Sequence, residues 1–100
     1  MKVFKFGGAS IKDISSIKNI LKIISTSNED RLVIVVSAMG KTTNALELVV
    51  HNYFNNKENL QASISEVYNF HSEIINNLFE KSHPIFSDIS KSFEKLNSFI

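Results

Sequence analysis

The sequence contains no cysteine, one proline and three glycines among its 100 residues. The absence of cysteine excludes disulfide bonds, thiolate catalysis and cysteine-ligated metal. An excess of one charge is also missing, since 11 basic and 10 acidic side chains give a net charge of +1. Nothing in this balance indicates a nucleic acid or an anionic membrane as partner. Because neither a transmembrane-length apolar run nor a signal-peptide pattern is present, we expect a cytoplasmic protein.

Two of the three glycines are adjacent and follow a short apolar strand, in the segment Lys5-Phe6-Gly7-Gly8-Ala9-Ser10. Without Cβ atoms, Gly7 and Gly8 can turn sharply and let backbone N–H groups approach a ligand. The next segment is expected to open a helix, whose N-terminus carries a partial positive charge. A lysine, bare backbone and a helix start together favour an anion site, most simply for phosphate. The alternative is a tight strand-to-helix turn with a surface lysine.

The next two elements predict a βαβ unit. Apolar residues recur at helical spacing from Ile11 to Ile24, with Ser10 or Asp13 as the candidate cap. After a polar stretch, residues 31–36 form a mostly β-branched run, which is typical of a parallel strand buried on both faces. In open α/β sheets, ligands bind off the carboxyl ends of the strands. We therefore expect Gly7-Gly8 and the segment after Val36 to share one edge of the sheet.

The segment after Val36, residues 37–44, is rich in small and hydroxylated side chains, which suits a loop that holds a small polar ligand. Gly40-Lys41-Thr42 resembles the end of a Walker A loop, but that motif also needs a glycine five residues before the Gly-Lys pair. Val35 stands there, so a P-loop is disfavoured. The simpler interpretation is a polar loop in which Thr42, Thr43 or Asn44 caps the following helix.

The rest of the chain is predicted to be helical scaffold. One helix is expected to run from about Thr43 to Asn55, a long amphipathic one from Leu60 to Leu78, and a third after His83-Pro84. The third carries an apolar seam for packing against another helix, formed by Phe86, Ile89, Phe93, Leu96 and Ile100. A coiled-coil dimer face is the alternative. The three histidines have no ligand spacing, so we interpret them as structural or surface residues.

Two motifs carry a resemblance to a known family. Lys5-Phe6-Gly7-Gly8-Ala9-Ser10, followed by Val35-Val36-Ser37-Ala38-Met39-Gly40 and Thr43-Asn44, resembles the start of the aspartate kinases, within the amino acid kinase family. The resemblance extends over the whole chain, but its specificity lies in residues 2–10 and 33–44. It implies an α/β fold, in which the N-terminal βαβ part of an amino acid kinase domain is followed by a largely helical segment.

The resemblance also implies an activity: ATP-dependent phosphorylation of the aspartate side-chain carboxylate, the first step toward lysine, threonine and methionine. Lys5 would act on the transferring phosphoryl group, since phosphoryl transfer depends on positioned positive charge. By the same resemblance, the ATP phosphates would be bound by Lys5, Gly7, Gly8 and Ser10. The aspartate substrate would be held by Ser37, Ala38 and Thr43. Mg²⁺ is expected with ATP, and no protein ligand for it is apparent in the sequence.

Two positions depart from the family pattern. Ala9 stands where the family often has threonine, and Lys41 places a charge in a loop that is often neutral. We interpret Lys41 as solvated; the alternative is that it attracts anionic substrates.

Residues 1–100 are expected to be an incomplete N-terminal part of the kinase domain, because an apolar stripe is still running at Ile100. The chain alone is then expected to be inactive, and its uncovered strand edges would allow self-association into a homo-oligomer. The alternatives are another amino acid kinase, or a small non-catalytic binding module.

Overall fold

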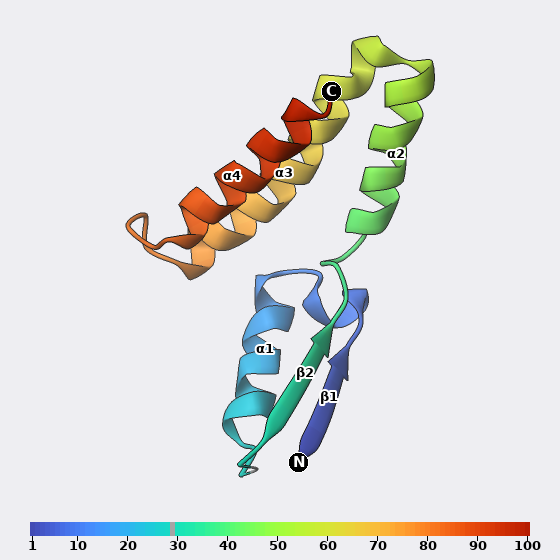
Figure 1. Ribbon diagram of the computed structural model, residues 1–100. Helices are drawn as coiled ribbons and strands as arrows, with labels where there is room; N and C mark the ends of the chain where they lie inside the picture. The colour runs from blue at the N-terminus through green and yellow to red at the C-terminus, as the bar shows by residue number, and fades with distance from the viewer. Residues whose placement is uncertain (29) are drawn as a thin grey trace. The chain divides into compact units, whose positions relative to one another are not determined.

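The computed structural model describes residues 1–28 and 30–100 (Figure 1). The chain divides into two compact units, residues 1–43 and 44–100, and each is described by itself. The elements are β1 (Lys2–Phe6), the 3₁₀ helix η1 (Gly8–Ile11), α1 (Ile14–Ser25), β2 (Leu32–Val36), α2 (Thr42–Asn55), the 3₁₀ helix η2 (Lys57–Asn59), α3 (Leu60–Leu78) and α4 (Ile85–Ser98). None of the described helices combines the length and the apolar character that crossing a membrane requires.

The first unit is the predicted βαβ unit. β1 and β2 form a parallel two-stranded sheet in which Lys2 pairs with Leu32 and Phe6 pairs with Val36. The chain passes from β1 to β2 through α1, which lies beside the sheet (Figure 1). A cluster of buried residues joins α1 to β1. It is formed by Phe6, Ile11 and Ile20, with Phe4, Ile17, Ile24 and Met39 packed against it. The α/β fold class inferred from the sequence is confirmed.

The expectation that residues 31–36 form a strand buried on both faces is wrong for the described chain. Val33, Ile34, Val35 and Val36 are 42–59% exposed. The physical reason is that β2 pairs only with β1 in the described sheet and α1 packs against one of its faces. A β-branched run shows that a strand suits burial, whereas burial itself depends on what packs against the strand.

The helix expected directly after the two glycines is also different from the prediction. Gly8–Ile11 form a single 3₁₀ turn, and α1 begins only at Ile14. Of the two candidate caps, Asp13 takes the position, because its carboxylate accepts the Ser16 N–H at 2.8 Å. Ser10 lies inside η1 instead. The N-terminus of a long helix therefore does not follow Gly7 and Gly8 directly, and an anion site there depends on local N–H groups and side-chain charge.

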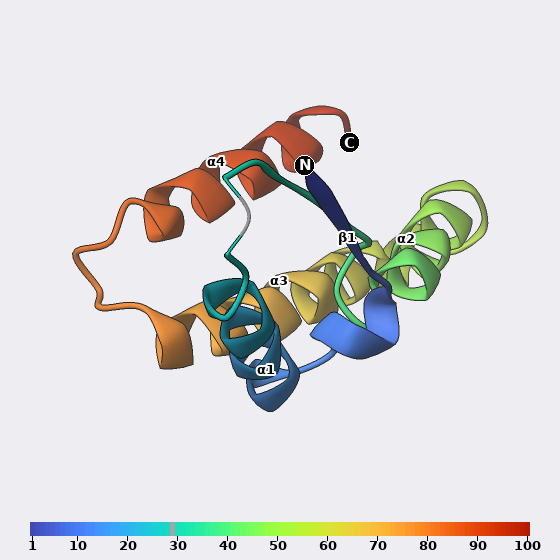
Figure 2. The ribbon, with the colours of Figure 1, turned by 90° about the horizontal axis from the view of Figure 1, so that it is seen from below.

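The second unit consists of helices. α2 and α3 meet around a buried cluster of Val49, Leu60, Ile64 and Val67, against which Ala45, Tyr53, Phe93 and Leu96 also pack. α4 runs back along α3 after the connection at residues 79–84 (Figures 1 and 2). The Tyr68 and Phe93 rings meet edge to face with their centroids 5.1 Å apart. The predicted packing of the Phe86–Ile100 seam against the preceding helix is thus confirmed for Phe93 and Leu96.

The predicted bounds of α3 agree with the structure, and α2 begins one residue earlier than predicted. Because α2 starts at Thr42, the residues Thr42, Thr43 and Asn44 lie in its first turn and do not precede it as caps. The Thr42 hydroxyl donates to the Met39 carbonyl at 2.6 Å, which ties the helix start to the loop before it.

Candidate functional site

Two loops leave the sheet at neighbouring strand ends. The first loop (residues 7–10) follows β1, and the second loop (residues 37–41) follows β2. Phe6 and Val36, the last residues of the two strands, are register partners. The Ser37 N–H then donates to the Phe6 carbonyl at 3.1 Å. The expectation that both loops share the carboxyl edge of a parallel sheet is therefore confirmed.

Lys5 lies one residue before the end of β1, on the face of the strand opposite Phe4 and Phe6. The two phenylalanines pack into the cluster under α1, whereas the Lys5 side chain is exposed. Within the part of the chain that the structure describes, the Lys5 ammonium group makes no hydrogen bond or ion pair. An unpaired ammonium group thus stands beside the start of the first loop, available to an anionic ligand.

The first loop offers open backbone. Gly7 is extended (φ −80°, ψ 176°), and a Cβ built on it would meet nothing within 4 Å. The Ser10 N–H closes η1 by donating to the Gly7 carbonyl at 3.0 Å, while the Ser10 side chain is exposed. As the first residues of a 3₁₀ helix, Gly8 and Ala9 have N–H groups without an intrahelical acceptor. The loop can therefore present N–H donors and one hydroxyl to a ligand.

The second loop is anchored by Met39 and Thr42, neither of which the sequence analysis proposed as a site residue. Met39 packs against the buried cluster of the first unit. Thr42 is 8% exposed, and both its hydroxyl and its N–H donate to the Met39 carbonyl, at 2.6 and 3.1 Å. Sequence reasoning assigned Thr42 only a capping role, because burial at a loop–helix junction cannot be inferred from residue type. The second loop is thus held by the packing of Met39 against the buried cluster and by hydrogen bonds from Thr42 at its C-terminal end.

The residues predicted to hold aspartate are exposed, two of them in the second loop and one in α2. Ser37 and Ala38 are exposed, and the Ser37 hydroxyl donates to the Ala38 carbonyl at 3.2 Å. Thr43 is exposed in the first turn of α2, and its hydroxyl makes no hydrogen bond within the described residues. Ser37 is brought next to the end of β1, whereas no side-chain hydrogen bond joins Thr43 to the other predicted residues in the described chain.

The two loops contact each other through glycine backbone. The Gly40 N–H donates to the Gly8 carbonyl at 3.2 Å. A Cβ built on Gly8 would lie 2.8 Å from the Gly40 carbonyl oxygen and 3.3 Å from that of Ala38. Gly40 has a positive φ of 56°, which favours glycine. A glycine just before a helix was the available signal for Gly40, but its contact with Gly8 depends on how the strands pair.

Charge is unevenly divided between the two units, although the whole chain is nearly neutral. Seven of the 11 basic residues but only three of the 10 acidic residues lie in residues 1–43. The unit that carries both loops therefore has a net positive charge. Such an excess raises the local concentration of anionic ligands.

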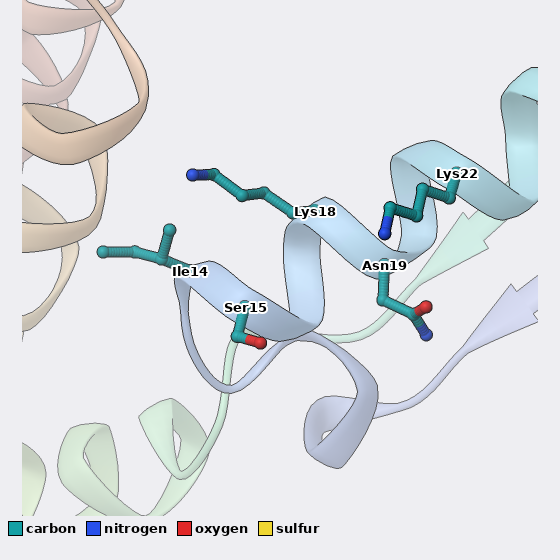
Figure 3. Close-up of a pocket in the computed structure, with 5 residues that line it drawn as sticks. All are labelled: Ile14, Ser15, Lys18, Asn19 and Lys22. Atoms are coloured by element: carbon teal, nitrogen blue, oxygen red, sulfur yellow. The ribbon is translucent and has the colours of Figure 1, made fainter.

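Two hollows of the first unit lie along α1. One is lined by Phe6, Ala9, Ser10, Lys12, Ser16, Asn19, Ile20 and Ile23, and thus touches the first loop through Ala9 and Ser10. Figure 3 shows another, lined by Ile14, Ser15, Lys18, Asn19 and Lys22, which includes no predicted site residue. Among the described residues, no group of three or more His, Asp or Glu side chains could hold a metal ion.

Comparison with known proteins yields one family. The family model described as "Amino acid kinase family" matches residues 1–89. The chain is also similar to "Aspartokinase 2, chloroplastic" and "Aspartokinase 1, chloroplastic" of Arabidopsis thaliana. The first match is 48% identical over 44 residues, which is 44% of this chain and 8% of that protein. The second is 50% identical over 46 residues, which is 46% of this chain and 8% of that protein.

A third similarity extends over the whole chain. It is 29% identical over 106 aligned positions to "Bifunctional aspartokinase/homoserine dehydrogenase" of Buchnera aphidicola subsp. Acyrthosiphon pisum, covering 100% of this chain and 13% of that protein. The chain thus spans 8–13% of the length of these three relatives.

Proposed function

The chain belongs to the amino acid kinase family, and from this premise we propose that its two loops are the phosphate loop and the aspartate loop of an aspartate kinase. In the complete enzyme, an oxygen of the aspartate side-chain carboxylate attacks the γ-phosphorus of ATP. The bond from that phosphorus to the bridging oxygen of ADP breaks, and 4-phospho-aspartate and ADP are released. The names of the three relatives, all aspartokinases, support aspartate as the acceptor.

The observation that carries this proposal is the exposed, unpaired Lys5 beside two loops that meet at one sheet edge. Phosphoryl transfer needs positioned positive charge more than covalent chemistry. Lys5 is therefore proposed as the catalytic residue, acting by charge on the transferring phosphoryl group. In the first loop, the N–H groups of Gly7 and Gly8 and the Ser10 hydroxyl would donate to phosphate oxygens.

Ser37, Ala38 and Thr43 are proposed to bind aspartate. Ser37 and Thr43 offer exposed hydroxyl groups, and Ala38 is an exposed small residue next to Ser37. A carboxylate acceptor is already a nucleophile, so this chemistry needs no general base. The positive excess of residues 1–43 favours the approach of both anionic substrates.

Mg²⁺ enters the proposal as the partner of ATP, whose phosphate oxygens can bind it. The described residues contain no cluster of three or more carboxylate or imidazole groups for a metal. We therefore propose that the ion is bound by the nucleotide, and we assign it no role at the residues of this chain.

The test is aspartate-dependent ATP turnover with Mg²⁺, measured on this chain and on the longest reading frame that contains it. Turnover is expected only in the longer protein, because the chain spans about a tenth of its relatives. In that protein, Lys5→Ala should lower kcat by orders of magnitude while aspartate binding is largely retained. Thr43→Ala should mainly raise the KM for aspartate.

Lys41→Ala is the matched control, because Lys41 is an exposed lysine in the second loop and is interpreted as solvated. Its loss should leave kcat near that of the unaltered enzyme. Equal losses for Lys5→Ala and Lys41→Ala would indicate a general charge effect and contradict a catalytic role of Lys5. Turnover with a different carboxylate but not with aspartate would identify another amino acid kinase. The absence of turnover with every acceptor tested would favour a binding module.

A further inference from the structure

Gly7 and Gly8 are adjacent in the sequence but meet different surroundings. At Gly7 an added Cβ would face open space, and the backbone there is extended, a conformation that any residue adopts. At Gly8 an added Cβ would lie 2.8 Å from the Gly40 carbonyl oxygen, closer than real Cβ atoms approach such an atom. The protein itself therefore requires glycine at position 8, whereas nothing within the described chain requires it at position 7.

The partner of Gly8 cannot easily give way. The clashing atom belongs to backbone, and the same residue, Gly40, donates its N–H to the Gly8 carbonyl at 3.2 Å. Gly40 is held in the left-handed region with φ 56°. On its C-terminal side, Thr42 binds the Met39 carbonyl twice, and Met39 packs into the buried cluster. The first loop thus rests against a second loop that is itself fixed.

We propose that Gly8 and Gly40 are positioning residues that form a backbone clasp, which sets the spacing between the phosphate-binding and the aspartate-binding loops. The inference rests on the proposed function. In phosphoryl transfer the acceptor oxygen must lie in line with the transferred group, and a displacement of about 1 Å can cost on the order of 100-fold in rate. A clasp at the contact of the two loops acts on both substrates at once, unlike a residue that binds only one of them.

The experiment compares Gly8→Ala with Gly7→Ala in the longest reading frame, measuring kcat and the KM for ATP and for aspartate. Both variants add one methyl group to neighbouring residues. Gly8→Ala should raise both KM values and lower kcat by about 10- to 100-fold, because the loops are pushed apart. Gly7→Ala should change the KM for ATP and leave that for aspartate unaltered, because its methyl group enters only the open side of the first loop.

If Gly8→Ala does not fold, a pair of variants at position 40 provides the test. Both Gly40→Ala and Gly40→Asn keep the N–H donor, but asparagine adopts a positive φ more readily than alanine. Gly40→Asn is therefore expected to retain lower KM values for both substrates than Gly40→Ala. Equal KM values for the two variants would overturn the clasp.

The outcomes also separate this inference from the proposed function. An unaltered enzyme without aspartate-dependent turnover would refute the function, and the clasp with it. An active enzyme in which Gly8→Ala changes only the KM for ATP, as Gly7→Ala does, would refute the clasp alone. A folded Gly8→Ala variant whose kcat and both KM values equal those of the unaltered enzyme would also overturn the positioning role.

Discussion

Ile11 connects the first loop to the core of residues 1–43, so shortening its side chain is expected to release the loop. Ile11 is the last residue of η1, is 7% exposed, and belongs to a cluster whose other buried members are Phe6 and Ile20. Replacing a buried isoleucine by alanine costs about 2–5 kcal/mol, whereas valine costs about 0.5–1.5 kcal/mol. The size of the unit decides which of these losses it can tolerate.

A unit of 43 residues has a free energy of unfolding of roughly 2–6 kcal/mol if it follows the usual value per residue. Ile11→Ala should therefore remove most of the stability of this unit, while Ile11→Val should leave it folded. The loss should appear first as weaker protection of α1 amides, since local opening follows local stability.

The assay is amide hydrogen exchange on the 100-residue chain, read by NMR at α1 and at α3. In Ile11→Ala, α1 protection should fall about 30-fold or more, because every 1.4 kcal/mol is a factor of ten. α3 contributes Leu60 and Ile64 to a different buried cluster, so its amides serve as the internal reference. Equal α1 protection in Ile11→Ala and Ile11→Val would refute the assignment of Ile11 to the core.

Two further predictions concern the ends of helices. The Ser16 backbone N–H and, secondarily, the Ser16 side chain lower the pKa of Asp13 below its ordinary value of 3.8. A lowered folded-state pKa stabilises the fold above the unfolded-state value and loses this effect as the pH falls through the folded-state value. The difference in Tm between the unaltered chain and Asp13→Asn should therefore shrink below about pH 4, and a constant difference down to pH 2 would contradict this cause. At the start of α4, the Ile85 N–H donates to the His83 Nδ1 at 3.0 Å, so His83→Ala should lower the free energy of unfolding by roughly 0.5–2 kcal/mol in urea denaturation. His83→Asn keeps an acceptor and should recover part of this loss; equal losses in both variants would rule out the hydrogen bond as the cause.

Features that depend on neighbouring residues in the chain could be predicted well. The spacing of apolar residues from Leu60 to Leu78 predicted the bounds of α3, and the two short apolar runs predicted both strands. Even the meeting of the two loops was predictable, because parallel strands bring their carboxyl ends to one edge. Because side chains alternate along a strand, Lys5 is expected on the face opposite Phe4 and Phe6, and the exposures agree.

Features that depend on what lies across from a residue could not be predicted. The choice of Asp13 over Ser10 as cap follows from the 3₁₀ turn that occupies residues 8–11. β2 is exposed because pairing and helix packing, not residue type, decide burial. The uneven division of charge between the units became visible only when the unit boundary was known.

The candidate site shows the same division. By itself, the sequence determined the residue types that can bind anions and their order along the chain: a lysine, two glycines, and a loop of small hydroxylated residues. Only the tertiary structure decided that the Gly40 backbone leaves no room for a Cβ at Gly8, while a Cβ at Gly7 would face open space. The physical reason is that residue type and spacing act along the chain, whereas close contacts between loops arise from strand pairing and from the packing of Ile11 and Met39 into one cluster.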